Sequence, residues 1–490
     1  MTLKTHRTLR IGTLLSFFLA IGLSARPQKH PEASKIIHAL LHAYVIKNET
    51  QKGMNLYDRM KFYGTPGISI AVIENFKIKW SEGFGSTLGA ANDSVTSQTL
   101  LQAGSISKAV TAVGAFRLVE QGKLYLDEDV NKQLVSWKVP QNDLTTNEKP
   151  TVRRILAHTA GFNNPGFESY AVGDTIPTLL QILDGQKPAN TLPVRVINIP
   201  GSKDEYSGGG YLVLQQLMMD VSKKPFPQLM KDLVFTPLEM SNSTFEQPLP
   251  LSLQTQAARG NQSGVAVKGS WTIKPEMAAG GLWTTPTDLA NLAVQIQLSL
   301  KGRSDKLLSQ ATTKKMLTLQ PNLDSFSSVA KRALGFEMNI EDNTVRFGHG
   351  GYTTGYRSEM VIFSNGQGAI VMSNGSSLSI LKEIMRGLAV AYGWPSYKPV
   401  IKTVISVDSV ILKSYVGEYK FPEGRRPQIS KVTYENGNLY FEGRLLKAET
   451  NNKFFGPGGD TYTFIKGEGG KIEQMIFEAG TLKLPTEKIN

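Results

Sequence analysis

Apolar and polar positions alternate in short runs at two places in the chain, and both predict antiparallel hairpins. Residues 67–73 and 77–80 read as two strands, with Glu74-Asn75-Phe76 as the turn between them. A second hairpin is predicted over residues 359–372, where Asn365-Gly366 has the composition of a tight turn.

Helical spacing of apolar residues dominates the stretch between the two hairpins. The clearest case is residues 105–121, which carry an apolar stripe and are followed by Gly122, a residue suited to the position just past a helix end. Residues 152–300 alternate helical stretches with loops rich in glycine and proline. Residues 379–392 predict a last helix, and residues 36–45 predict one near the N-terminus.

The pattern changes after residue 395 to short β-like runs and glycine turns. Residues 432–434 and 439–441 flank Asn436-Gly437, a strong signal for another hairpin. We therefore predict an α/β (α+β) domain, in which an antiparallel sheet is flanked by helices with a helical subdomain alongside, and a small all-β C-terminal domain. The predicted parts are a signal peptide over residues 1–25, the α/β domain over residues 26–395 and the all-β domain over residues 396–490.

The N-terminus has the order of features that is typical of a secretory signal peptide. Lys4, Arg7 and Arg10 precede a mostly apolar run over residues 11–23, and Ser24-Ala25 supplies small residues at the cleavage point. The run is shorter than the roughly 20 residues of a membrane span, although an uncleaved anchor stays an alternative. We expect an exported protein, periplasmic or extracellular.

Composition excludes several kinds of chemistry. The chain contains no cysteine, which excludes disulfides, a cysteine nucleophile and any cysteine-ligated metal. The formal net charge is +13, which is compatible with an anionic cell envelope or polymer as a partner, although solubility alone accounts for it. No dense basic block is interleaved with aromatic residues, so nucleic acid is not an expected partner. His38 and His42 are four residues apart, yet neither a neighbouring glutamate nor a third ligand accompanies them, so we expect no metal site.

The candidate chemistry is a serine with a lysine three residues later, because on a helix both lie on one face and the amine can take the hydroxyl proton. This spacing occurs at Ser105/Lys108, Ser328/Lys331 and Ser379/Lys382. Ser328 and Ser379 fit a polar loop and a helix cap. Ser105 follows Gly104 at a predicted helix N-terminus, where free backbone N–H groups stabilise developing negative charge. We therefore assign Ser105 as the nucleophile and Lys108 as its base.

Six blocks of sequence resemble, in the same order, the class C β-lactamase and penicillin-binding-protein-related serine hydrolases. The blocks are TPGISIAV (65–72), AGSISK (103–108), LAHTAGF (156–162), YSGGGY (206–211), GGLWTTP (280–286) and GHGG (348–351). The resemblance covers about residues 60–390 and implies the β-lactamase/transpeptidase-like arrangement, with the active site between the sheet and the helical subdomain. Residues 412–419 resemble the start of the lipocalin-like β-domain that follows some members of this family.

The resemblance also implies a role for individual residues and calls for no metal or organic cofactor. The implied catalytic residues are Ser105, Lys108, Tyr206 and His349. Backbone N–H groups of Ser105 and Tyr352 would form the oxyanion hole, and the implied substrate-binding residues are Gly208, Gly350 and Gly351. Trp283 follows two glycines and is a further candidate for the substrate pocket, with core packing as the equally weighted alternative. His158 has no implied catalytic role, and we expect it to be a hydrogen-bonded structural histidine.

Two positions depart from the family pattern. Gly208 stands where relatives have an asparagine that touches the catalytic lysine and the substrate amide, and His349 stands where many have a lysine. Both changes remove contacts that a β-lactam uses. We therefore expect a serine hydrolase that cleaves amide or ester bonds through an acyl-Ser105 intermediate, with D-amino-acid peptides or small esters as substrates. A β-lactamase proper and a non-hydrolytic penicillin-binding or sensor protein remain the alternatives, and the oligomeric state stays open.

Overall fold

The computed structural model describes residues 1–2, 30–50, 52–89, 93–321, 323, 331–341, 344–422, 428–479 and 482–489. Nearly all of the predicted signal peptide, and Ser328 with it, lies outside the described residues. Within the described part of the chain, no helix combines the length and the apolar character needed to cross a membrane.

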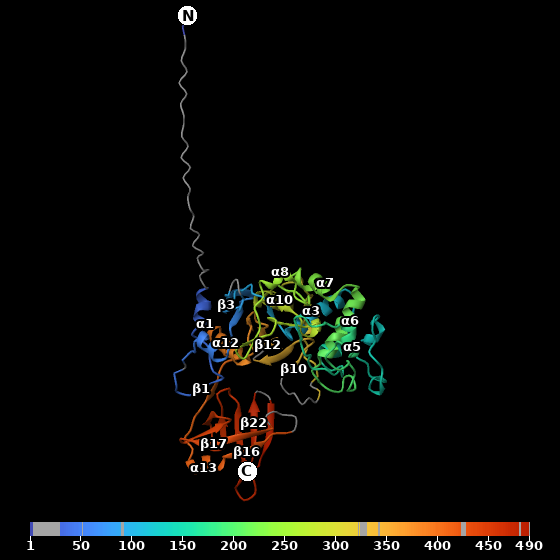
Figure 1. Cartoon of the computed structure of the whole chain (residues 1–490). Helices are drawn as coiled ribbons and strands as arrows, with labels where there is room; N and C mark the ends of the chain where they lie inside the picture. The colour runs from blue at the N-terminus through green and yellow to red at the C-terminus, as the bar shows by residue number, and fades with distance from the viewer. Residues whose placement is uncertain are drawn as a thin grey trace.

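A seven-stranded antiparallel sheet forms the centre of the larger domain, in the order β10-β11-β12-β13-β14-β2-β3. Figure 1 labels β3, β12 and β10 of this sheet. Both predicted hairpins are confirmed, as β2 with β3 and as β13 with β14, and β2 pairs with β14, which joins the two ends of the domain. The strands are β2 (Gly67–Glu74), β3 (Lys77–Gly85), β10 (Lys331–Arg332), β11 (Glu337–Glu341), β12 (Thr344–Thr353), β13 (Tyr356–Phe363) and β14 (Gly368–Ser373).

Helices cover both faces of this sheet, so alternate residues of one strand enter different cores. Ile70 and Val72 of β2 belong to the core shared with α1 (Pro31–Ile36) and α12 (Leu378–Ala391). Ala71 and Ile73 belong instead to the core shared with α3 (Ile106–Glu120) and α10 (Pro286–Leu300). Burial on both faces explains why β2 is apolar along nearly its whole length.

The helix predicted over residues 105–121 is confirmed as α3, but it is buried on almost every side. Of its 15 residues, 12 are buried, so the single apolar stripe expected from the sequence is wrong. It lies between the sheet and the helical subdomain, against α6 and α9. The helices on that side are α4 (Val152–Leu156), α5 (Leu179–Asp184), α6 (Gly208–Ser222), α7 (Phe226–Met230), α8 (Leu251–Gln254), α9 (Met277–Gly280) and α11 (Gln310–Met316).

The helix predicted over residues 36–45 is wrong. The helix α1 ends at Ile36, and the chain then enters the short strand β1 (Tyr44–Ile46). This strand pairs in parallel with β15 (Val400–Lys402), and that partner lies some 350 residues away, which a reading of local spacing cannot see. The other helix of the N-terminal segment is α2 (Leu56–Phe62).

The C-terminal segment forms a closed eight-stranded barrel, which confirms the predicted β-domain and its hairpin at Asn436-Gly437. The barrel fills its centre with its own aromatic and aliphatic side chains and lies beside the larger domain (Figure 1). Lys402 contacts Glu449 of the barrel at 2.9 Å, and the rings of Tyr44 and Phe455 meet with centroids 4.6 Å apart. The strands are β16 (Gly417–Lys420), β17 (Ile429–Glu435), β18 (Asn438–Phe441), β19 (Arg444–Ala448), β20 (Lys453–Phe455), β21 (Thr461–Lys466), β22 (Ile472–Ala479) and β23 (Leu482–Lys488).

Candidate active site

Ser105 stands at the N-terminus of α3, on a turn that its neighbours clamp in place. Gly104 before it has φ +54°, a conformation that favours glycine. Ser107 donates its hydroxyl to Gly104 O at 2.6 Å and accepts the Leu282 N–H at 3.0 Å. The Ala103 N–H donates to Leu282 O at 2.9 Å. The GGLWTTP block therefore holds the turn formed by Ala103, Gly104 and Ser105, which is called the nucleophile turn after the predicted role of Ser105. Ser107 fixes this turn, a contribution that the sequence did not indicate.

Lys108 reaches the Ser105 hydroxyl from one helical turn further along. Its Nζ lies 3.1 Å from Ser105 Oγ and donates to Ala279 O of α9 at 2.7 Å. The side chain is 3% exposed, and its Nζ lies 4.9 Å from the ring centroid of Tyr206. Because one N–H is directed at Ala279 O, the remainder of the amine is oriented toward the serine.

Strand β12 lies in direct backbone contact with the nucleophile turn. A Cβ added to Gly104 would lie 2.5 Å from Tyr352 N, and one added to Gly351 would lie 2.0 Å from Ala103 O. Ser358 of β13 donates its hydroxyl to the same Ala103 O at 2.7 Å. These contacts bring the Tyr352 backbone beside Ser105, as an oxyanion hole made of their two N–H groups requires.

Tyr206 is positioned through His158. The Ser207 N–H donates to Nδ1 of His158 at 3.0 Å, so this histidine carries its proton on Nε2. The ring centroids of His158 and Tyr206 lie 4.3 Å apart. Burial, with Arg332 and Lys108 nearby, holds the pKa of His158 well below its usual value and keeps it neutral. Lys108 meets Tyr206 through the ring face; within the described residues no hydrogen bond joins the Tyr206 hydroxyl to Ser105 or Lys108.

His349 is buried at the position of the family's lysine. Its Nδ1 lies 2.6 Å from Gly350 O, and since a carbonyl only accepts, Nδ1 carries the proton and Nε2 is left as an acceptor. Burial lowers the pKa of His349; Glu337 opposes that effect and Lys108 adds to it. A neutral imidazole therefore takes the place of a fixed positive charge.

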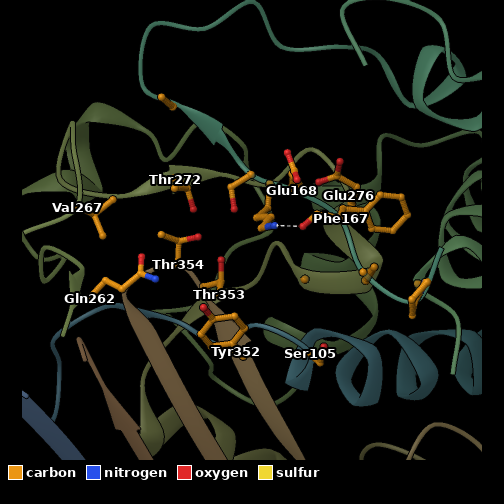
Figure 2. A pocket seen from close by; sticks show the side chains of 18 of the residues that line it. Ser105, Phe167, Glu168, Gln262, Val267, Thr272, Glu276, Tyr352, Thr353 and Thr354 are labelled. Atoms are coloured by element: carbon orange, nitrogen blue, oxygen red, sulfur yellow. Dashed lines mark hydrogen bonds between the residues drawn. The ribbon is translucent and has the colours of Figure 1, made fainter. Parts of the chain in front are cut away.

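A cavity of about 1090 Å³ opens above Ser105 and Lys108 (Figure 2). Gly208 and Tyr352 also line it, and its walls come from residues 165–171, 262–268 and 272–280. Each lining residue in the described chain lies between Ser105 and Thr354, so the barrel contributes none of them.

Phe167 occupies the space that the family's asparagine would need. A Cβ added to Gly208 would lie 2.8 Å from Cε2 of Phe167 and 3.3 Å from Asn164 O. Lys274 donates its ammonium to Phe167 O at 2.7 Å, and the dashed line beside Phe167 in Figure 2 marks this bond. Where the family has the asparagine side chain, the cavity wall here consists of the Phe167 ring and the Lys274 side chain.

Three predicted substrate-binding residues do not line the cavity. Trp283 is fully buried, with its ring centroid 5.5 Å from that of Trp271 and 5.8 Å from that of Tyr356. Of the two alternatives for Trp283, the structure places the side chain in the core and not in the substrate pocket, because its strand β9 (Trp283–Thr284) pairs with β4 (Leu101–Gln102) just before Ser105. Gly350 and Gly351 lie on β12, and Gly351 allows that strand to approach Ala103.

The cavity wall holds one chemically unusual residue that the sequence did not single out. Glu276, the residue before α9, is 1% exposed, and burial raises its pKa to about 7, with Lys274 opposing the rise. Burial lowers the pKa of Lys274 in turn. A lone glutamate in the stretch Lys274-Pro275-Glu276 gives no signal of burial. The described residues contain no group of three or more metal-ligating side chains.

The sequence model of the family described as Beta-lactamase matches residues 55–384, about two thirds of the chain. The chain belongs to the beta-lactamase family. The matched range contains Ser105, Lys108, Tyr206 and His349, and with this family and fold the protein is a serine hydrolase. Among curated relatives, the teichoic acid D-alanine hydrolase of Staphylococcus aureus is 26% identical over 231 residues, which cover 47% of this chain and 54% of that protein. The chain thus spans about half the length of the curated relatives it matches.

Solved structures show the same fold. The octameric penicillin-binding protein homologue from Pyrococcus abyssi superposes with a TM-score of 0.58 at 21% identity, covering 88% of this chain and 98% of that one. The D-amino acid amidase from Ochrobactrum anthropi SV3, complexed with L-phenylalanine, gives a TM-score of 0.55 at 20% identity, covering 69% of this chain and 97% of that one. At these identities the likeness shows the fold alone.

Proposed function

We propose that this member of the beta-lactamase family hydrolyses amide or ester bonds through an acyl intermediate on Ser105. The observation that carries the proposal is the 3.1 Å contact between Lys108 Nζ and Ser105 Oγ at the floor of the cavity. A serine hydroxyl is a weak nucleophile by itself, and an amine within hydrogen-bond distance can take its proton as the new bond forms.

Acylation follows from this geometry. The Ser105 oxygen attacks the substrate carbonyl carbon while its proton passes to Lys108, and the carbonyl oxygen becomes an oxyanion facing the N–H groups of Ser105 and Tyr352. Collapse of this intermediate breaks the bond to the amine or alkoxide, which takes the proton from Lys108. The position of Ser105 at the start of a helix adds the positive end of the helix dipole to the same oxyanion.

Deacylation reverses the roles. A water molecule attacks the ester on Ser105, Lys108 takes its proton, and the serine oxygen leaves with a proton returned by the same amine. The ring of Tyr206 covers Lys108, and neutral His349 lies next along with its ring centroid 6.3 Å from that of Tyr206. In this proposal Tyr206 acts on Lys108 through its ring face and His349 lines the same region as a neutral side chain.

Substrates in this proposal are D-amino-acid peptides or small esters outside the cytoplasm. The curated relative named as a teichoic acid D-alanine hydrolase supports this class, and the predicted signal peptide supports export. Against a β-lactam stand the neutral His349 and the Phe167 ring above Gly208.

A hydrolysis panel on the purified protein tests the proposal. It sets p-nitrophenyl esters, D-alanyl peptides and a chromogenic cephalosporin side by side. We expect turnover of the esters and D-alanyl peptides to exceed that of the cephalosporin. Faster cephalosporin hydrolysis would indicate a β-lactamase, and a stoichiometric adduct on Ser105 without turnover, seen by mass spectrometry, would indicate a penicillin-binding or sensor protein.

A further inference from the structure

The carboxyl group of Glu276 is buried in the wall of the cavity above Ser105 and has no hydrogen-bond partner on another described residue. Both of its oxygens are inaccessible to bulk solvent, and neither accepts a hydrogen bond from another described residue. As the residue that precedes α9, it also makes no cap to that helix. Buried polar groups in folded proteins are nearly always paired, so an orphaned carboxyl in a substrate cavity indicates a group supplied from outside the chain.

Lys274 attracts this carboxyl electrostatically but forms no ion pair with it. Lys274 donates to Phe167 O, and no N–O contact within 4.0 Å joins it to Glu276 in the described chain. Glu168, exposed on the same wall, adds a second negative charge close to Lys274. Figure 2 shows Glu168 and Glu276 together on the side of the cavity opposite Ser105 and Tyr352.

We propose that Glu276 binds the free ammonium group of an aminoacyl substrate, so that the enzyme selects acyl groups that carry an unblocked amine. The inference rests on the proposed hydrolase function and names its substrate class. An ammonium group offers up to three N–H donors and one positive charge, which suits a carboxylate that accepts no hydrogen bond from another described residue. It stands one carbon away from the acyl carbon in an amino acid, so a small aminoacyl group presents its charge and its carbonyl to the same cavity.

The pair of charges gains strength from burial. A carboxylate at 1% exposure is shielded from water, so a cation that reaches it is bound more tightly than at the surface. Removing one member of such a charged hydrogen bond changes affinity by about 10- to 100-fold. A neutral acyl group of the same size forms no hydrogen bond with the Glu276 carboxyl, so this carboxyl adds nothing to its binding affinity.

The test compares three p-nitroanilides that differ only at the amine: D-alanyl, N-acetyl-D-alanyl and propionyl. For the wild-type protein we expect kcat/KM of the D-alanyl substrate to exceed that of the propionyl substrate at least tenfold at pH 7. Glu276→Gln keeps the shape and removes the charge; it should lower kcat/KM for the D-alanyl substrate about 10- to 100-fold and change that for the propionyl substrate less than twofold. Glu246→Gln, an exposed glutamate outside the cavity, is the matched control and should change neither.

Each other outcome overturns the assignment. Equal losses on both substrates would make Glu276 a structural residue, and a loss with Glu168→Gln alone would move the amine to Glu168. If kcat/KM for the N-acetyl-D-alanyl substrate equals that for the D-alanyl substrate, the site recognises a neutral N–H and not an ammonium group. Should Glu276→Gln fail to fold, the wild-type protein still tests the proposal: a kcat/KM for the D-alanyl substrate that equals that for the propionyl substrate contradicts it. Absence of turnover on all three substrates would instead refute the hydrolase function itself.

Discussion

Gly104 and Tyr352, nearly 250 residues apart in the chain, lie in backbone contact. A Cβ on Gly104 would lie within 2.8 Å of the N, C and O atoms of Tyr352. No side chain fits between the nucleophile turn and β12, and this closeness is what places the two proposed oxyanion N–H groups next to each other. The glycine before the nucleophile is therefore required by space as well as by its φ of +54°.

The variant Gly104→Ala should lose acylation about 10²- to 10³-fold, the loss typical of removing one oxyanion-hole donor, because the new methyl group pushes β12 away. The matched control is Gly122→Ala, since Gly122 has a similar φ of +67° but nothing within 4 Å of its Cβ position. It should lower stability by about 1 kcal/mol through backbone strain and leave acylation unchanged. The rate of labelling by a fluorophosphonate measures acylation, and thermal unfolding measures stability. Equal losses of acylation in the two variants would contradict the role assigned to the contact between Gly104 and Tyr352.

Lys108→Ala should slow acylation about 10²- to 10⁴-fold, because general-base assistance is lost while the serine remains. Since Lys108 also donates to Ala279 O, a loss of folding has to be separated from a loss of chemistry. Lys108→Met keeps much of the apolar length of the side chain and should show the same kinetic defect with a smaller change in melting temperature. An acylation rate within twofold of wild type in either variant would remove Lys108 from the mechanism.

His158→Ala should lower kcat through the position of Tyr206. The substitution leaves the Ser207 N–H without its acceptor at 3.0 Å and removes the ring that stacks on Tyr206. A buried donor left unpaired lowers stability by about 1–3 kcal/mol. His158→Asn offers an acceptor oxygen again and should recover part of both effects; an unchanged kcat in the alanine variant would show that this histidine only stabilises the fold.

Glu276 makes the stability of the protein depend on pH. Its pKa rises from 4.5 in the unfolded chain to about 7 in the folded protein, so between these values the folded state holds more protons. Stability contributed by the neutral form is therefore present below pH 4.5 and is lost as the pH rises toward 7. Glu276→Gln, which stays neutral, should exceed the wild-type stability by about 1 kcal/mol at pH 5 and about 3 kcal/mol at pH 8. Chemical denaturation at the two values measures this, and a constant difference would contradict it.

The sequence predicted the fold well where the signal is local or carried by motifs. Strands β2, β3, β13 and β14 were found from alternation and turn residues, and the barrel hairpin from Asn436-Gly437. Local spacing failed at residues 36–45, because β1 is held by a partner strand at residues 400–402. It also failed to show that α3 is buried on nearly all sides, which depends on the helices and strands that surround it.

The candidate site divides in the same way. Ser105 and Lys108 followed from helix spacing and a preceding glycine, and the structure brings their side chains together. The sequence left Trp283 open between pocket and core, because a block shared with the family does not tell which of its residues faces the cavity. The sequence did not indicate Phe167 and Glu276, because they come to line the cavity only where loops distant in sequence meet above Ser105.

The most direct test of the central claim is covalent labelling of Ser105. Wild-type protein treated with a fluorophosphonate should gain one adduct, which peptide mass spectrometry places on Ser105, and Ser105→Ala should gain none. Ser379→Ala, which removes another serine with the same spacing to a lysine, should label at the wild-type rate. Labelling of Ser105→Ala at full strength would contradict the assignment of the nucleophile.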